Sequence, residues 1–338
     1  MKSLKLTVLF LCLYVLTANA SAQDIGRYLV PQEARDALIE MKASVHHGSA
    51  GGDFTVDLTP EEIEVLRRHG FEVRPFPAEE ETYALGGLGS WTSYGQIRAD
   101  FIAYAANYPD IAEYHVIGHS VQGREIFGLR ISDNIQLEED EPEVVFWGNI
   151  HGDEEASGEI TYNYAMELLD NYGAQPTVTG FINDFEIWVL PLTNPDGRVM
   201  STRENANGVD LNRDFGWNWD HWGGSTSPYS QVETQAFQEF CLENNVTLSA
   251  TLHCSGNIFL YPWCYSPTDV PEDNLVQSVG ALYANAANYT LIKSWDDYET
   301  HGELLDLMYG GHGALCYTPE ISNSLNNFPN SYARNKAG

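Results

Sequence analysis

Side chains that bind divalent metal ions follow two apolar segments of this chain. Val144 to Trp147 is followed by His151 and, three residues later, by Glu154. The second segment, Thr247 to Leu252, is followed directly by His253. Zinc binds imidazole nitrogen and carboxylate oxygen, and a catalytic zinc has three protein ligands and one open position. His-x-x-Glu alone is also compatible with a solvated helix start, but the second histidine favours a single zinc ion held by all three side chains.

Two further groups could do chemistry beside such an ion. Glu320 ends a third apolar segment, Ala314 to Pro319, where a carboxylate is suited to act as a general base. The loop from Arg203 to Arg213 contains two arginines and Asn212. A guanidinium donates hydrogen bonds in a fixed fork that fits a planar carboxylate. The loop is therefore a candidate carboxylate-binding site, and a solvated loop without a ligand is the alternative.

Strands and helices alternate along the part of the chain that carries these residues. Hydrophobic periodicity and capping signals predict strands at residues 115–118, 125–131, 144–147, 185–191, 247–252 and 314–320, and helices at 94–107, at 155–169 and from an N-cap at Ser230 through Glu243. This alternation indicates an α/β fold, a three-layer sandwich with a mixed, largely parallel central sheet flanked by helices. Functional sites in such sheets gather at the carboxyl ends of strands, where His151 and His253 are expected.

Residues 1–22 have the pattern of a secretory signal. Lys2 and Lys5 precede an apolar run from Leu6 to Leu16, and small residues near positions 20–22 offer a cleavage site. That run is too short to span a bilayer, and no later one is long enough. We therefore expect an exported protein, extracellular or periplasmic, without stable membrane insertion.

Residues 23–80 predict a small α+β accessory domain or pro-segment ahead of the main domain at 90–338. A strand is expected at 54–58, a helix from Thr59 and Pro60 with Glu62 completing a capping box, and a second strand at 71–73. The segment from Pro75 to Gly89 has the composition of an exposed linker. Whether this unit inhibits the main domain or is a fixed part of it stays open.

Charge and cysteine content narrow the classes of partner. The formal net charge is −31, and it becomes −33 without the signal, which holds two lysines and no acidic residue. Such an excess argues against nucleic acid or anionic membrane as a partner; solubility and a preference for basic substrates both explain it. The four cysteines beyond the signal could form two disulfides in three connectivities. They are Cys241, Cys254, Cys264 and Cys316.

From Tyr94 to Glu320 the chain resembles the zinc carboxypeptidases of the pancreatic A/B type. Each of its motifs is modest alone, but their order makes the resemblance specific: His151-x-x-Glu154, Asn194-Pro195-Asp196-Gly197, Arg203, Asp210-x-Asn212-Arg213, His253 and Glu320. The resemblance implies a monomeric peptidase that removes single residues from peptide or protein C-termini. It also implies one Zn²⁺ per chain, held by His151, Glu154 and His253, with the fourth position left for water.

The same resemblance implies a role for each remaining motif residue. Asp210 would orient His151, Glu320 would be the general base, and Arg203 would stabilise the oxyanion. The substrate's terminal carboxylate would be held by Asn212 and Arg213. Tyr298, 22 residues before Glu320, resembles the family's mobile tyrosine, with an ordinary surface aromatic as the alternative.

Substrate preference depends on fewer signals. Leu305 falls where the family has its deciding specificity residue, and an apolar side chain there implies a weak preference for apolar C-terminal residues. Lys293 and Cys264 are further candidates for the same pocket, and a lysine there would favour acidic termini. Asp153 stands where digestive members often carry arginine. The family also continues with a long helix after its general base, and no such helix is predicted in the 18 residues after Glu320.

Three other functions share parts of this pattern. A deacylase of N-acyl amino acids and a peptidase of murein stems would use the same zinc ligands. A binding module that recognises C-terminal carboxylates without cleaving them would lose the general base or a ligand. The presence of Arg213, Tyr298 and Glu320 in register favours the carboxypeptidase.

Overall fold

The computed structural model describes residues 26–41, 43–47, 53–76, 91–137 and 139–338. The chain divides into two compact units, Met1–Phe76 and Pro77–Gly338. The predicted signal at 1–22 and most of the predicted linker lie outside the described residues. Across the described residues, no helix is both long and apolar enough to cross a membrane.

The described residues of the first unit form a four-stranded antiparallel sheet with two α-helices. Its strands lie in the order β2 (Ser44–His47), β3 (Asp53–Leu58), β1 (Gly26–Pro31) and β4 (Arg74–Pro75). A 3₁₀ turn (Gln32–Ala34) leads into α2 (Arg35–Met41), and α3 (Pro60–Arg68) follows β3. The predicted capping box is present: the Thr59 hydroxyl accepts from the Glu62 N–H at 3.3 Å, and Glu62 Oε2 accepts from the Thr59 N–H at 2.8 Å.

The last strand of this unit lies later in the chain than predicted. Residues 71–73 are not a strand, because Phe71 and Val73 form hydrogen bonds with the last turn of α3 and not with a neighbouring strand. The Phe71 N–H donates to the Leu66 carbonyl, and Arg67 Nη2 donates to the carbonyl of Val73 at 3.1 Å. The chain therefore pairs with β1 only at Arg74–Pro75.

The second unit is built on a mixed sheet, and most of its strand pairs are parallel. The strand order is β12-β11-β13-β9-β7-β8-β6-β5, with β10 paired beside β13. The strands are β5 (Ala112–His119), β6 (Glu125–Ile131), β7 (Glu143–Trp147), β8 (Glu186–Leu190), β9 (Val246–Thr251), β10 (His253–Cys254), β11 (Ile258–Tyr261), β12 (Thr290–Lys293) and β13 (Leu315–Ile321). The central run β13-β9-β7-β8 is parallel throughout, whereas β6 pairs antiparallel with both β8 and β5. The predicted α/β architecture is confirmed.

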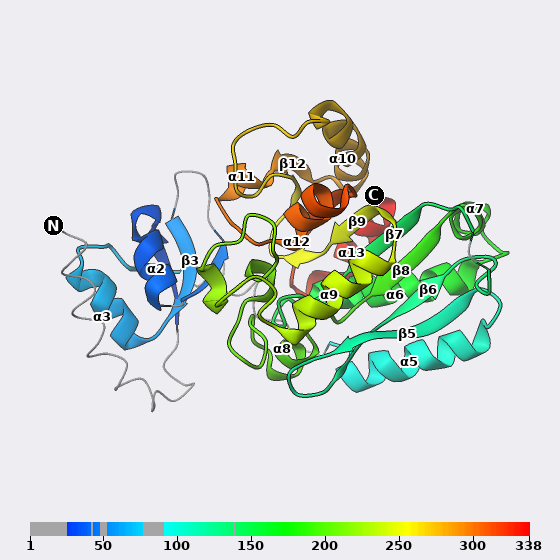
Figure 1. Ribbon diagram of the computed structural model, residues 1–338, viewed down its shortest axis with the longest axis horizontal. Helices are drawn as coiled ribbons and strands as arrows, with labels where there is room; N and C mark the ends of the chain where they lie inside the picture. The colour runs from blue at the N-terminus through cyan, green and yellow to red at the C-terminus, as the bar shows by residue number, and fades with distance from the viewer. Residues whose placement is uncertain (1–25, 42, 48–52, 77–90, 138) are drawn as a thin grey trace. The chain divides into compact units, whose positions relative to one another are not determined.

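Helices cover both faces of this sheet, so that it forms the middle of three layers (Figure 1). Successive residues of a strand face opposite sides, and each side has its own core. On β8, Trp188 and Leu190 pack with α9, while Ile187 and Val189 pack with α5 and α6. The helices are α5 (Tyr94–Asn107), α6 (Glu155–Asn171), α7 (Pro176–Asp184), α8 (Pro195–Met200), α9 (Val232–Glu243), α10 (Asp273–Ala287), α11 (Ser294–Asp297), α12 (Leu304–Asp306) and α13 (Phe328–Ala337).

Ser230 is not the N-cap of α9, contrary to the prediction. The helix begins at Val232 with Gln231 as its cap. Ser230 instead donates from both its N–H and its hydroxyl to Asp214 Oδ1, at 3.1 and 2.7 Å. The buried Asp214 carboxylate also accepts from the Gln231 N–H and the Thr234 hydroxyl. A distant carboxylate therefore holds the chain ahead of α9, a contact that local sequence does not signal.

A helix of ten residues follows Glu320, in a segment where the sequence predicts no long helix. It is α13, in which Pro329 occupies a first-turn position that needs no N–H donor. The Tyr332 hydroxyl donates to Glu167 on α6 at 2.7 Å, and the Arg334 guanidinium lies 4.5 Å from the ring centroid of Tyr289. The segment is mostly polar, so its helix depends on these tertiary contacts rather than on an apolar stripe.

Candidate functional site

The turn between β7 and α6 is shaped by Asn149, a residue that the sequence did not single out. Asn149 is fully buried and has a positive φ of 58°. Its Nδ2 donates to the carbonyl of His151 at 2.6 Å and to that of Glu154 at 3.3 Å, and its own N–H donates to the Ser157 hydroxyl. Asparagine tolerates this left-handed conformation better than most residues. The turn thus fixes His151 and Glu154 at the carboxyl end of the sheet.

The Asn194 turn holds two loops of the site together. Asn194 Nδ2 donates to the carbonyls of Ile150 and Arg203, at 3.1 and 3.3 Å, and its Oδ1 accepts from the Gly197 N–H. The turn approaches so closely that a Cβ on Gly152 would lie 2.0 Å from the Gly197 carbonyl carbon. Glycine at 152 is therefore required for this packing.

His151, Glu154 and His253 meet at one point, as the sequence predicted for a metal site. Their donor atoms lie within 4.8 Å of one another, and all three side chains are buried. Glu154 Oε1 is 2.7 Å from His151 Nδ1, Glu154 Oε2 is 3.1 Å from His253 Nδ1, and the two Nδ1 atoms are 3.1 Å apart. Ligands bound to one zinc at about 2.0–2.2 Å cannot be more than roughly 4.4 Å apart. Ligand types and spacing both fit zinc.

Charges around the three ligands favour a cation. Burial acts to raise the pKa of the Glu154 carboxyl, but attraction to His151 and His253 outweighs it and holds that pKa well below its usual range. Burial lowers the pKa of His253, which keeps a lone pair available. For His151, burial and Arg203 act to lower the pKa, yet the carboxylates of Glu154 and Asp210 raise it to about 9. A metal ion binding here would therefore displace a proton from His151.

Glu320 lies beside the ligands on a neighbouring strand. The backbone pairs His253 of β10 with Glu320 of β13 in parallel register. The carboxyl group is buried, and its Oε2 has no hydrogen-bond partner among the described residues. Burial, followed by repulsion from Glu154 and Asp297, raises its pKa well above the usual range for glutamate. A general base works best with a pKa near the working pH, so this environment suits that role.

Arg213 lies at the centre of the predicted carboxylate-binding group. Its Nη2 donates to the Tyr298 hydroxyl at 2.8 Å, and its Nη1 donates to Glu303 Oε1 at 3.0 Å. Asn212 is buried and accepts the Leu304 N–H through its side-chain oxygen at 3.0 Å. The structure therefore brings Asn212, Arg213 and Tyr298 together, and it adds Glu303, which the sequence did not identify.

The structure adds detail on two further residues predicted for the specificity pocket, Leu305 and Lys293. Leu305 is 1% exposed and belongs to the apolar core beside the sheet. Lys293 is also buried, but its Nζ binds Asp269 Oδ1 at 2.5 Å and the Pro267 carbonyl at 2.9 Å, so its charge is already paired.

The four cysteines beyond the signal are not paired with one another. Each is a buried free thiol, and for every one of them burial is the main cause of a raised pKa. The cysteine count alone allows disulfides, but the structure pairs none of the four: Cys241, Cys264 and Cys316 belong to one apolar cluster and Cys254 to another. Cys241, for example, donates to the sulfur of Met308 at 3.5 Å.

Comparison with known families agrees with this geometry. Residues 97–333 match the sequence model of a protein family, Peptidase_M14, which is described as zinc carboxypeptidase. The chain belongs to the zinc carboxypeptidase family. That span contains His151, Glu154, His253 and Glu320, and the family's zinc dependence agrees with the donor set.

Individual relatives share only limited sequence identity with this chain. Carboxypeptidase SOL1 of Arabidopsis thaliana is 28% identical over 250 residues, which cover 72% of this chain and 51% of the relative. Human carboxypeptidase D is 33% identical over 199 residues, 54% of this chain and 14% of that protein. The chain thus spans about half or less of these curated relatives. The crystal structure of carboxypeptidase A from Helicoverpa armigera matches with a TM-score of 0.77 at 19% identity, covering 94% and 96% of the two chains, and shows the shared fold.

Proposed function

We propose that this chain is an exported zinc-dependent metallocarboxypeptidase that hydrolyses the C-terminal peptide bond of peptides. The observation that carries the proposal is the Glu320 carboxyl, which is buried, has a free Oε2 and lies beside His151, Glu154 and His253. Zinc bound by those three side chains would act as a Lewis acid on the scissile carbonyl and lower the pKa of water.

Glu320 would accept the proton of the attacking water and return it to the leaving amine. Its raised pKa favours both steps, because the carboxyl can take up a proton and hold it until the amine leaves. Arg203 is buried, and its Nη1 lies 3.1 Å from His151 Nδ1 and 3.5 Å from Glu154 Oε1. A fixed guanidinium next to the ligands would stabilise the oxyanion as it develops.

Arg213, Asn212 and Tyr298 would bind the free carboxylate of the substrate. A guanidinium and a phenol hydroxyl already in contact at 2.8 Å form a donor group suited to a carboxylate. This requirement for a free C-terminus is what would make the enzyme an exopeptidase. Leu305, on its position alone, favours a weak preference for apolar C-terminal residues, and this is the alternative to the charge-based selection proposed in the next subsection. Peptide or protein C-termini as partners, export and a monomeric state are parts of the same proposal.

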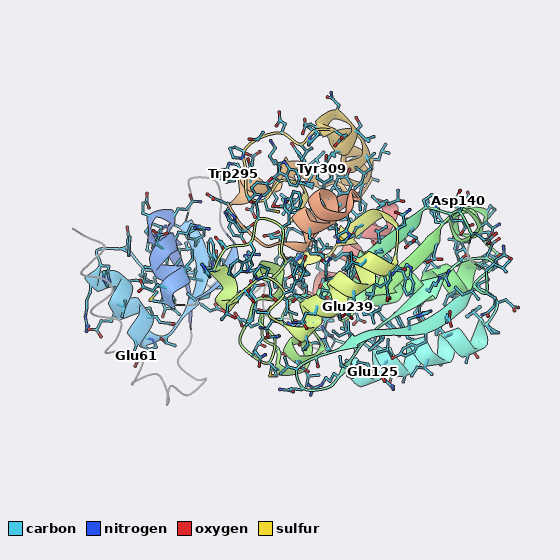
Figure 2. The ribbon with its side chains drawn as sticks, viewed as in Figure 1. Glu61, Glu125, Asp140, Glu239, Trp295 and Tyr309 are labelled. Atoms are coloured by element: carbon cyan, nitrogen blue, oxygen red, sulfur yellow. The ribbon has the colours of Figure 1, made fainter. Side chains whose placement is uncertain are left out.

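The test measures metal content and turnover of the purified chain, with Glu320→Gln as the key variant. Blocked dipeptides with a free C-terminus are the substrates, and matched dipeptide amides and N-acyl amino acids are the comparisons. Glu239→Gln is the control, because Glu239 is exposed on α9 (Figure 2). We expect one zinc per chain, and a loss of roughly 10²–10⁴-fold in Glu320→Gln with zinc retained.

Other outcomes would assign a different function. Equal cleavage of the dipeptide amides would remove the carboxylate requirement and with it the role of Arg213. Faster turnover of N-acyl amino acids would favour a deacylase. Zinc bound without turnover of any substrate would favour a binding module.

A further inference from the structure

Glu303 holds a buried carboxylate directly against the proposed carboxylate-binding arginine. The residue precedes α12, is 8% exposed, and its Oε1 accepts from Arg213 Nη1 at 3.0 Å. Its second oxygen, Oε2, faces the Cys264 thiol at 3.3 Å. Among the hydrogen bonds and ion pairs of the described residues, Arg213 is thus the one cation in contact with Glu303.

A substrate carboxylate bound by Arg213 would change this balance. Arg213 would then serve two carboxylates, and a buried carboxylate that loses its counter-charge is strongly destabilised. The other buried cations nearby are already engaged. Arg203 Nε and Nη2 both donate to Asp210 Oδ2 at 3.0 Å, and Lys293 is paired with Asp269. A replacement cation would have to come with the substrate.

The surroundings of Glu303 are acidic. Burial, and then the charge of Glu303, raise the pKa of Asp297 to about 7 and that of Asp306 to about 8. Glu303 is also among the carboxylates that raise the pKa of Glu320. A cationic group entering here would be attracted to Glu303 and would favour ionisation of these neighbouring carboxyl groups, whereas an anionic one would be repelled by Glu303.

Two buried hydroxyls, one on the segment before Glu303 and one on the strand of Glu320, have no hydrogen-bond partner among the described residues. Thr300 and Thr318 are 1% and 4% exposed, and Oγ1 of each is unpaired. The Thr300 N–H donates to the Cys264 carbonyl at 3.1 Å. Thr300 therefore contacts the backbone of the residue whose thiol faces Glu303. Thr318 lies two residues before Glu320 on β13, and therefore on the same face of the strand. Unpaired buried hydroxyls are suited to accept hydrogen bonds from a ligand's N–H groups.

We propose that Glu303 is the specificity-determining residue of this site and selects C-terminal residues with a cationic side chain. When the terminal carboxylate of a peptide takes Arg213, Glu303 exchanges its partner and pairs with the ammonium or guanidinium group of a C-terminal lysine or arginine. The inference rests on the proposed function. It replaces the apolar preference expected from Leu305, a side chain that is wholly enclosed in the core.

The experiment compares two blocked dipeptides that differ only in charge, one ending in arginine and the other in citrulline. The wild type is expected to prefer arginine by at least about tenfold in kcat/KM, as for a close buried charge pair. Glu303→Gln should bring the ratio close to one. Glu303→Asp should restore part of it, because a carboxylate remains. Glu299→Gln, the same change at an exposed neighbouring position, should leave the ratio unchanged.

The outcomes separate a specificity role from a structural one. An equal loss for both dipeptides in Glu303→Gln would mean that Glu303 only positions Arg213, and would overturn the proposal. A wild-type ratio near one would overturn it as well. If no dipeptide is cleaved, the proposed function fails, and calorimetric binding of free arginine and free citrulline then decides the role of Glu303 by itself. Retention of zinc and of the wild-type Tm shows that each variant is folded.

Discussion

Asp210 connects His151, a candidate zinc ligand, to the buried Arg203. Its Oδ1 lies 3.1 Å from His151 Nε2, and its Oδ2 accepts from Nε and Nη2 of Arg203 at 3.0 Å. Burial acts to raise the pKa of Asp210, but attraction to Arg203 and His151 outweighs it and holds the pKa well below the usual range. The carboxylate therefore stays ionised and accepts a hydrogen bond from the protonated Nε2 of His151. This leaves Nδ1 of His151 as the nitrogen that is available to a metal ion.

We predict that Asp210→Asn weakens zinc binding about 10- to 100-fold, since the partner that orients the imidazole becomes neutral. Competition with a chelator of known affinity measures the change. Asp140→Asn is the matched control, because Asp140 is exposed (Figure 2) and precedes β7, whereas His151 and Glu154 follow that strand. An unchanged zinc affinity in Asp210→Asn would show that the hydrogen bond to His151 contributes nothing to binding.

The sequence predicted that the candidate metal ligands lie together, because the residues that end a strand can be recognised from local sequence. His151 follows β7 and His253 follows β9, and β7 and β9 are parallel neighbours, so the two histidines had to meet. The helix at 94–107 was predicted with its observed bounds, because a capping serine starts it and a proline follows its end.

The features that the sequence did not reveal depend on contacts between distant residues. Glu303 is a candidate site residue only because it pairs with Arg213, 90 positions earlier in the chain. Ser230 is fixed by Asp214 rather than by α9. The helix α13 has little apolar periodicity of its own, and tertiary contacts such as the bond from Tyr332 to Glu167 stabilise it. Such partners are far away in the chain, so the local sequence pattern cannot predict them.

The pH dependence of stability should reveal the buried Asp306. Its pKa is raised to about 8, by burial and then by Glu303, and both oxygens accept from the Cys264 N–H at 3.1 Å. The folded chain therefore keeps a proton that the unfolded chain releases near the ordinary aspartate pKa of 3.8. A raised folded pKa gives stability that is present at low pH and is lost as the pH rises toward 8.

We predict that Asp306→Asn removes part of this loss, because an amide keeps one acceptor and cannot ionise. Relative to the wild type, the variant should gain free energy of unfolding steadily between about pH 4 and pH 8, by a few kcal/mol in all. Urea unfolding at a series of pH values measures the difference. The exposed Asp296→Asn should run parallel to the wild type. A constant difference between Asp306→Asn and the wild type across this range would contradict a raised pKa.

Asn323 ties the chain after β13 to the metal-binding turn. Its Oδ1 accepts the Ala156 N–H at 3.0 Å, one of the unpaired donors in the first turn of α6, and its Nδ2 donates to the Asp153 carbonyl at 2.9 Å. Asn323→Ala leaves both backbone groups without this partner in a buried setting. The free energy of unfolding should fall by about 1–3 kcal/mol.

The same substitution should also affect the proposed zinc site. Asp153 and Ala156 lie on either side of Glu154, so their backbone contacts to Asn323 help to fix the position of Glu154. We expect faster zinc loss to a chelator together with the lower stability, and Asn326→Ala at an exposed position should show neither effect. Amide hydrogen exchange would localise the change: protection should drop first at Ala156 and Ser157, in the first turn of α6. Loss of stability with unaltered exchange in that turn would place the effect of Asn323 elsewhere, in the segment leading to α13.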